Sequence, residues 1–200
     1  MSQAETSTSD DIERAPRILP LSPDELSPEA LELATRLRSA FGHQTSEIPK
    51  VMATMLRHPE LYQAQVDYFV RRAGALIGDP RLREIALLRM SWLCQSGYLW
   101  GEHVAIGKAV GLTSEEIDRI TRGAAEAGWT ELESALIAAV DEMRETATIG
   151  DANWEILAAK ISEQELIELL ILIGDYQLAS SLYNALRVEL AEGNPGLSAR

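Results

Sequence analysis

The strongest constraint on the fold is a series of helix-start signals, each followed by apolar residues at helical spacing. Ser or Asp before a proline, and Ser/Thr-x-x-Glu capping boxes, satisfy the free backbone amides of a first helical turn. These signals begin at Ser27, Asp79, Thr113, Thr130 and Ser162. The apolar residues that follow recur every three or four positions, and no stretch alternates like a half-buried strand. The sequence therefore predicts an all-α chain.

We expect about eight to nine helices packed as a bundle in a single domain. The predicted helices span 28–41, 47–57, 59–77, 80–94, 98–110, 114–122, 131–146, 151–159 and 163–191. Residues 1–26 are predicted to form a flexible tail and a proline-rich arm, because the tail has little to bury and prolines favour extended backbone. The helical domain is expected over 27–194, followed by a flexible C-terminus at 195–200.

Charge and composition restrict the possible partners and compartment. The formal net charge is -13, with no long basic cluster, so phosphate backbones and anionic lipids would be repelled. We therefore expect no nucleic-acid and no membrane partner, and we interpret the apolar stretch 166–173 as a buried helix. The chain has one cysteine, Cys94, and its N-terminus does not resemble a signal peptide, which together favour a cytoplasmic protein.

A carboxylate and a histidine form the candidate chemical site. Glu84 lies beside the predicted buried face of the helix over 80–94, where a carboxylate needs a partner. The poor helix formers Gln-Ser-Gly at 95–97 predict a break, after which His103 follows on the next helix. With Gly97 at that break, Glu84 and His103 are expected to meet across two adjacent helices.

Three pieces of sequence in this region match a known pattern. They are Arg83-Glu84, the run Gly-Tyr-Leu-Trp-Gly-Glu-His at 97–103, and the run Gly-Leu-Thr-Ser-Glu-Glu-Ile at 111–117. Together they resemble the carboxymuconolactone decarboxylase family, of the alkylhydroperoxidase D-like superfamily, over roughly residues 56–120. Softer matches lie at 58–61, 174–176 and 182–185. The resemblance implies the alkylhydroperoxidase D-like helical fold.

The resemblance also implies which residues do the chemistry. Redox members of the superfamily combine a glutamate and a histidine with two cysteines, and here the cysteine positions hold Ser96 and Leu99. A dithiol cycle cannot run without those thiols, so the chain is similar to the decarboxylase branch. The implied function is acid/base chemistry of the decarboxylase, lyase or isomerase type on a small organic acid or lactone. His103 would be the acid or base and Glu84 would orient it.

The other candidate residues surround this pair. Tyr98 is predicted to donate a hydrogen bond to the substrate, and Cys94, Ser96 and Trp100 to line the pocket. Histidines elsewhere have no second ligand at metal-binding spacing, so no metal and no cofactor is expected. The last helix has more apolar residues than one buried face needs, which predicts a homo-oligomer. The resemblance implies that this oligomer is a dimer, a trimer or a hexamer.

Three other interpretations of these residues stay open. Glu84 could pair only with Arg81 or Arg89 and His103 could serve only helix packing. The chain could instead be an alkylhydroperoxidase- or peroxiredoxin-like redox protein that uses Cys94. It could also be a non-catalytic helical oligomer that kept the fold and lost the chemistry.

Overall fold

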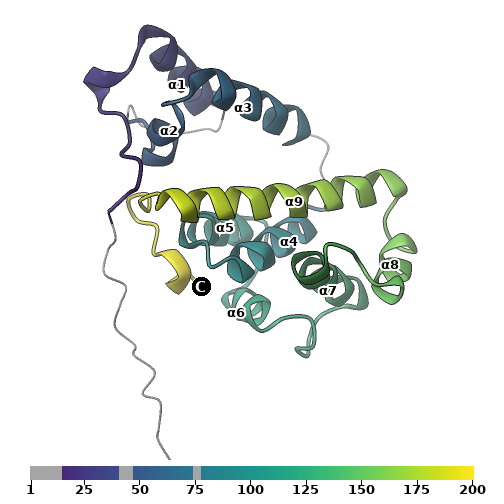
Figure 1. The fold of residues 1–200 in the computed structure, drawn as a ribbon. Helices are drawn as coiled ribbons and strands as arrows, with labels where there is room; N and C mark the ends of the chain where they lie inside the picture. Colours follow the sequence, from purple (N-terminus) through teal and green to yellow (C-terminus); the bar gives the residue numbers. More distant parts are fainter. Residues whose placement is uncertain (1–14, 41–46, 74–77) are drawn as a thin grey trace, which may run out of the picture.

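The computed structural model describes residues 15–40, 47–73 and 78–200, and all regular secondary structure in these ranges is helical (Figure 1). The helices are α1 (Pro28–Ala40), α2 (Lys50–Met55), α3 (Pro59–Ala73), α4 (Pro80–Leu93), α5 (Gly97–Ala109), α6 (Ser114–Arg122), α7 (Glu131–Thr146), α8 (Asp151–Ala158) and α9 (Glu163–Leu186). Two short 3-10 helices, η1 (Pro23–Glu25) and η2 (Gly196–Ser198), flank them. The all-α prediction is confirmed. Residues 1–14 of the predicted tail and arm, and the expected helix residues 41 and 74–77, lie outside the described ranges.

The helices begin where the capping residues predict. The hydroxyls of Thr113, Thr130 and Ser162 each accept a hydrogen bond from the amide three residues on, and the glutamate there bonds back to the cap amide. Asp79 caps α4 by accepting from the amides of Arg81 and Leu82. These starts are local, because each one needs only a side chain and a backbone amide within the same turn.

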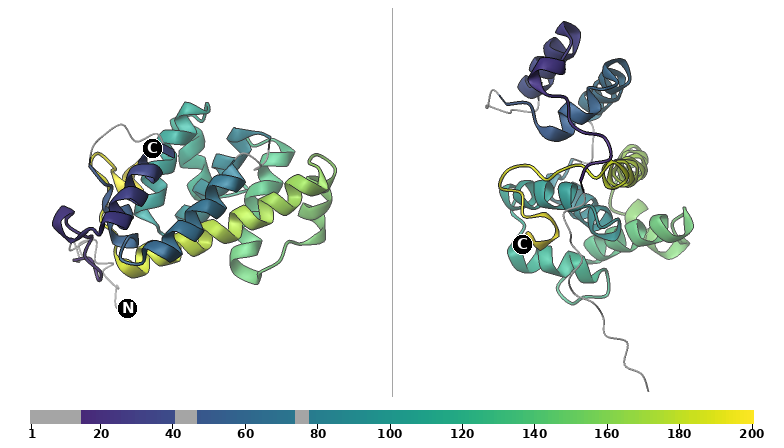
Figure 2. Two further views of the ribbon diagram at one scale, coloured as in Figure 1. Left: turned by 90° about the horizontal axis from the view of Figure 1, so that it is seen from above. Right: turned by 60° about the vertical axis from the view of Figure 1, so that its left-hand side comes forward.

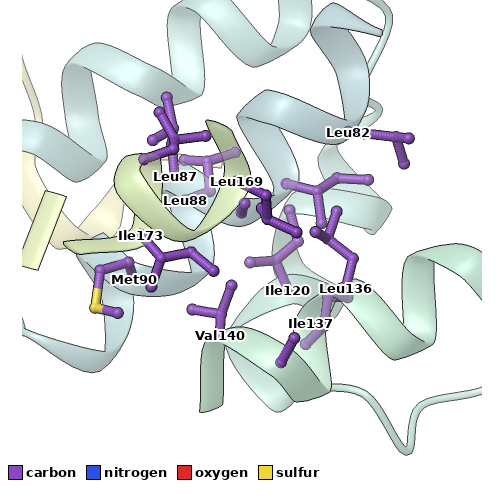
Figure 3. Packing of buried hydrophobic residues seen from close by; sticks show 14 of the residues in the cluster. Leu82, Leu87, Leu88, Met90, Ile120, Leu136, Ile137, Val140, Leu169 and Ile173 are labelled. Atoms are coloured by element: carbon purple, nitrogen blue, oxygen red, sulfur yellow. The ribbon is translucent and has the colours of Figure 1, made fainter. Parts of the chain in front are cut away.

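The main hydrophobic core is built around α4. Its apolar residues pack against α5, α6, α7 and α9. Figure 3 shows the part of this core that α4 forms with α6, α7 and α9. Leu88, Ile137 and Leu169, from three of these helices, are fully buried. The residues of α4 from Ile85 to Ser91 are all buried, so this helix has no solvent face along that stretch. Any polar group on it must therefore find its partner inside the protein.

A second, smaller core lies in the N-terminal part of the chain. Helices α1 to α3 bury Ala34, Leu37, Leu56 and Val66 against one another. In the right-hand view of Figure 2 these three helices form a separate layer above α9. Polar contacts join this layer to α9, among them a hydrogen bond of 3.1 Å from the Tyr68 hydroxyl to Asp175 Oδ2. The N-terminal layer therefore contacts α9, the helix that also contributes residues to the main core.

The described part of the proline-rich arm is hydrogen-bonded to other segments of the same chain. The amide of Arg17 donates to the carbonyl of Leu186 at 3.0 Å, and the amide of Leu21 donates to the carbonyl of Ala53 at 3.2 Å. Arg57 Nε also donates to the carbonyl of Leu19 at 2.7 Å. These bonds fix the arm between the end of α9 and α2.

Helix α9 is shorter than predicted. It ends at Leu186 rather than 191, because Arg187 takes the left-handed conformation with φ 54° and the chain turns back. With 24 residues and a mean hydropathy of 1.3 in its most apolar window, it satisfies the length and composition of a membrane-spanning helix. The central helix of a soluble bundle satisfies them too, and Leu166, Leu169, Leu172 and Ile173 of α9 lie in the main core.

The segment 193–200 is packed against α5, which corrects the predicted flexible C-terminus. Asn194 Nδ2 donates to the Tyr98 carbonyl at 3.0 Å, and Trp100 Nε1 donates to the Ala199 carbonyl at 3.1 Å. Ala199 is only 5% exposed, and the Arg200 guanidinium lies over the Trp100 ring. The sequence of the segment did not show this docking, because the partners in these two bonds lie 96 and 99 residues away.

Gly101 makes the docking possible, and its replacement by alanine is expected to undo it. A Cβ there would lie 1.7 Å from Asn194 Oδ1, so the Asn194 side chain would have to move and lose its hydrogen bonds. Gly101→Ala should lower the free energy of unfolding by about 1–3 kcal/mol and expose the segment to carboxypeptidase. Gly174→Ala is the matched control, since no atom lies within 4 Å and alanine favours a helix. Equal stability of the two variants would contradict the prediction.

Candidate active site

The turn between α4 and α5 sets the direction in which the site residues approach. Gln95 adopts the left-handed conformation with φ 51°, and the amide of Ser96 bonds to the carbonyl of Ser91 at 2.9 Å. The amide of Gln95 bonds to the carbonyl of Trp92 at 2.9 Å, which completes a Schellman motif. The helix break therefore falls as predicted, but Gln95 makes it, and Gly97 is already the first residue of α5.

Glu84 and His103 meet across α4 and α5, as the sequence predicts. The distance from Glu84 Oε2 to His103 Nδ1 is 2.7 Å. Glu84 is 1% exposed and His103 is 9% exposed, so both groups are withdrawn from water. Arg83 Nε donates to the other carboxylate oxygen, Oε1, at 3.2 Å, which balances the buried negative charge.

Tyr176 of α9 is the third member of this chain of hydrogen bonds. Its hydroxyl lies 2.9 Å from His103 Nε2, and the two rings meet edge to face. An ionised carboxylate only accepts hydrogen bonds, so His103 Nδ1 donates to Glu84. In neutral imidazole the other nitrogen is then an acceptor, and Tyr176 donates its hydroxyl hydrogen to His103 Nε2. We call Glu84, His103 and Tyr176 the relay.

The arginines considered as alternative partners of Glu84 have other partners. Arg81 Nη2 donates to Glu116 Oε1 at 2.6 Å and to Glu133 Oε1 at 2.9 Å. The bond to Arg81 holds the pKa of the Glu116 carboxyl low, at about 2. Arg89 pairs with Asp141. Among the described residues, Glu84 is therefore committed to His103 and Arg83.

Tyr98, expected to face the substrate, has a different environment. Its ring meets the ring of Tyr183 edge to face with centroids 5.6 Å apart. Burial raises the pKa of the Tyr98 hydroxyl well above its usual value, and burial also raises the pKa of Tyr183 to about 12. The phenol that bonds to His103 is that of Tyr176 rather than Tyr98.

The three residues predicted to line the pocket have different environments. Trp100 is fully buried and its indole N–H is used by the Ala199 carbonyl, so it belongs to the core and to the docking of the C-terminal segment. Ser96 is fully buried at the start of α5, with no partner for its hydroxyl among the described residues. Cys94 is half-buried at the end of α4, where its Sγ lies 3.6 Å from Met90 Sδ. Of the three, Ser96 is the one with an unused polar atom.

The described residues contain no group of three or more His, Cys, Asp or Glu side chains placed to hold a metal ion. The relay has a single imidazole and a single carboxylate in direct contact, and its third member is a phenol. Such a chain can accept a proton at one end and stabilise the resulting charge at the other. This arrangement can support proton transfer at the Tyr176 hydroxyl.

Comparison with known proteins agrees with this fold. An uncharacterized peroxidase-related protein from Silicibacter sp. TM1040 superposes with a TM-score of 0.73, at 14% identity, over 95% of this chain and 99% of that one. A peroxidase-related protein with an alkylhydroperoxidase AhpD core, from Ralstonia eutropha JMP134, gives 0.71 at 15% identity, over 89% and 95%. The debrominase Bmp8 gives 0.69 at 15% identity, over 88% and 92%.

Sequence comparison points to the same group of proteins. No curated protein matches the chain in sequence. Residues 59–142 match the model of the carboxymuconolactone decarboxylase family, a range that includes α4, α5 and the turn between them. Over this region the chain is similar to the carboxymuconolactone decarboxylase family, and its fold is that of alkylhydroperoxidase D-like proteins.

Proposed function

We propose that the chain is an acid/base enzyme that moves a proton at a carbon next to a carbonyl group of a small organic acid or lactone. The decarboxylase, lyase and isomerase reactions expected from the sequence all contain such a step. The observation that supports the proposal is the unbroken relay, with 2.7 Å between Glu84 and His103 and 2.9 Å between His103 and Tyr176. A carboxylate, an imidazole and a phenol in direct hydrogen-bond contact are groups that general acid/base catalysis uses.

The relay would act through the Tyr176 oxygen. As the substrate C–H bond breaks, its proton goes to the Tyr176 oxygen, and the Tyr176 proton moves to His103 Nε2. The electron pair of the C–H bond remains on the substrate as an enolate. The buried carboxylate of Glu84 stabilises the imidazolium that forms, because opposite charges in contact interact strongly away from water. Reversal of the same steps returns a proton to the carbon.

The proposed substrate class follows from the place of the relay and from a likeness in fold. A group that exchanges a proton through a half-buried phenol between helices suits a small molecule rather than a polymer. A variant of the debrominase Bmp8 is known in complex with 2,3,4-tribromopyrrole, so the same fold accommodates a small ring in that protein. This likeness in fold is compatible with a small lactone or ketoacid here.

A redox role for Cys94 has less support. The thiol lies at the C-terminal end of α4, where the helix dipole is negative, and its neighbour is the Met90 thioether. Reactive cysteines need electropositive surroundings. The sequence has no other cysteine to act as an intramolecular resolving thiol.

We further propose that the protein works as a homo-oligomer. Ile167, Ile171 and Leu178 are exposed and lie at helical spacing on one face of α9, with Leu178 58% exposed. An apolar face of this length is typical of a surface that a second subunit covers.

Proton exchange tests the proposed function directly. Pyruvate has protons next to its carbonyl, and the wild-type protein is expected to exchange them in D₂O above the uncatalysed rate, followed by NMR. Tyr176→Phe should lose about 100-fold in rate, because the phenylalanine has no proton to pass. Tyr68→Phe, which removes an exposed hydroxyl bonded to Asp175, is the control and should keep the wild-type rate. No exchange by the wild type with pyruvate, other ketoacids or carboxylated lactones would refute the proposal.

A further inference from the structure

The direction of the hydrogen bonds in the relay depends on the charge of Glu84. An ionised carboxylate accepts from His103 Nδ1, which leaves Nε2 as the acceptor that faces the Tyr176 hydroxyl. A protonated carboxyl would donate to Nδ1, and the neutral imidazole would then carry its hydrogen on Nε2 and donate to the Tyr176 oxygen. In this reversed state His103 cannot take the Tyr176 proton. Proton transfer from Tyr176 therefore requires an ionised Glu84.

Burial opposes the ionised form of Glu84. The Glu84 side chain is 2% exposed and the His103 side chain is 11% exposed. A carboxylate that has lost its hydration takes up a proton unless a nearby positive charge replaces the water. A neutral imidazole supplies a hydrogen bond but no net charge. The ionised carboxylate therefore needs a positive charge from another side chain.

Arg83 supplies this charge at the second carboxylate oxygen. Its Nε lies 3.2 Å from Glu84 Oε1, while His103 bonds to Oε2. Adjacent residues on a helix do not normally face each other, so the Arg83 side chain folds back across the carboxylate. The Arg83 side chain is 26% exposed and keeps contact with water. Its charge is therefore placed against the carboxylate at a smaller desolvation cost than that of a fully buried cation.

Other charged groups on the helices around Glu84 have partners elsewhere. The carboxylates of α6 and α7 pair with the other arginines of α4: Glu116 and Glu133 with Arg81, and Asp141 with Arg89. On α5 and α9 the contacts are Glu102 with Asn194, Lys108 with the Arg200 carbonyl, Glu165 with Ser162, and Asp175 with Tyr68. Among the described residues, Arg83 is the only arginine or lysine that forms an ion pair with Glu84.

We propose that Arg83 is a positioning residue that holds Glu84 ionised and thereby sets the direction of the relay. Arginine does not lose its proton in a protein, so this charge is always present. Without it, the buried Glu84 would bind a proton near neutral pH. The proton would lie on Oε2, where His103 Nδ1 accepts it, because Oε1 has no other partner among the described residues. The effect of Arg83 on the reaction rate rests on the proposed function, whereas its effect on the His103 tautomer does not.

The position of the His103 hydrogen tests this role without any substrate. Nitrogen NMR on protein with isotope-labelled histidine shows which ring nitrogen carries the hydrogen, and the spectrum of His103→Gln identifies the His103 signals. The wild type is expected to carry the hydrogen on Nδ1 at neutral pH. Arg83→Met should carry it on Nε2 at neutral pH and return it to Nδ1 at alkaline pH, where Glu84 loses its proton. Arg83→Lys keeps the charge and should resemble the wild type.

Two further variants control for net charge and for folding. Arg122→Met removes the same charge from the molecule, but at ion pairs of α6 in which the arginine side chain is 49% exposed. It is the matched control and should keep the wild-type tautomer at every pH. Arg83→Gln is a second neutral variant that retains a hydrogen-bond donor, for use if Arg83→Met does not fold. It should behave like Arg83→Met, because a neutral donor does not supply the missing charge.

The pH dependence of pyruvate proton exchange measures the consequence for the reaction. Loss of a positive charge disfavours the carboxylate, so the rate of Arg83→Met should rise at a higher pH than that of the wild type. The rising part of the profile is expected to shift by about one to two pH units, the equivalent of one hydrogen bond to a charged group. Below it the rate should fall roughly 10- to 100-fold, and it should recover at alkaline pH. A residue that only served packing would lower the rate equally at every pH.

The outcomes separate the role of Arg83 from the proposed function. A hydrogen on Nδ1 in the folded neutral variants at neutral pH would overturn the role of Arg83, as would a hydrogen on Nε2 in the wild type. If the hydrogen moves to Nε2 in Arg83→Met while the wild type exchanges no pyruvate protons, the role of Arg83 stands and the proposed function fails. If the wild type exchanges and Arg83→Met keeps both its tautomer and its pH profile, the proposed function stands without a directing role for Arg83.

Discussion

Replacing His103 by glutamine is expected to slow proton exchange roughly 100- to 10,000-fold, the range that a general acid or base contributes. Glutamine keeps a polar side chain that can donate to Glu84 Oε2, so the buried carboxylate retains a partner. It cannot accept the Tyr176 proton and become a stable cation. The variant therefore lacks a proton acceptor between Tyr176 and Glu84, while the packing around the site is largely preserved.

The Glu84→Gln variant separates proton transfer from packing at the same site. The amide is close in size to the carboxylate but has no charge to stabilise an imidazolium, so a loss smaller than that of His103→Gln is expected. Circular dichroism and thermal unfolding check that both variants are folded. Exchange at the wild-type rate by a folded His103→Gln variant would show that the histidine only serves packing.

Replacing Arg89 by methionine is expected to lower the free energy of unfolding by about 3 kcal/mol, the cost of breaking a buried ion pair from one side. Arg89 is 7% exposed. Its guanidinium donates to both carboxylate oxygens of Asp141, at 2.6 and 3.0 Å. It also donates to the carbonyls of Ile120 and Thr121, at 2.8 and 3.0 Å. One side chain thereby joins α4, α6 and α7, and methionine would leave those acceptors unpaired.

Arg122→Met is the control for this stability prediction. Arg122 also pairs with two carboxylates, Asp118 and Glu126, but its side chain is 49% exposed. Water replaces the lost bonds there, so a change below about 0.5 kcal/mol is expected. Urea unfolding followed by circular dichroism measures both variants. Similar decreases in the free energy of unfolding for Arg89→Met and Arg122→Met would mean that burial does not determine how much these ion pairs stabilise the protein.

The helical elements could be predicted from sequence because their signals are local. The capping boxes at Thr113, Thr130 and Ser162 determine three helix starts within a single turn each. The ends were harder to predict, as Arg187 shows: a non-glycine residue takes the left-handed conformation, and α9 stops before its apolar pattern does. The docking of residues 193–200 was missed because it depends on a small residue, Gly101, in a distant helix.

The candidate site was predicted only in part. Glu84 and His103 are 19 residues apart with a recognisable break between them, so their meeting could be expected from two adjacent helices. Tyr176 is 73 residues from His103, and its helix has many apolar residues at similar spacing. The run Gly-Asp-Tyr at 174–176 was its one signal, and it came from family resemblance rather than periodicity.

The sequence by itself determined the all-α class, the helix starts and the pairing of Glu84 with His103, since these depend on backbone amides and side chains a few turns apart. Only the tertiary structure decided that Tyr176 completes the relay and that the hydroxyls of Ser91, Ser96 and Ser180 are buried without partners among the described residues. The physical reason is that the position of α9 against α4 and α5 follows from core packing by many apolar residues together. No local pattern specifies which polar side chains that packing will bring into contact.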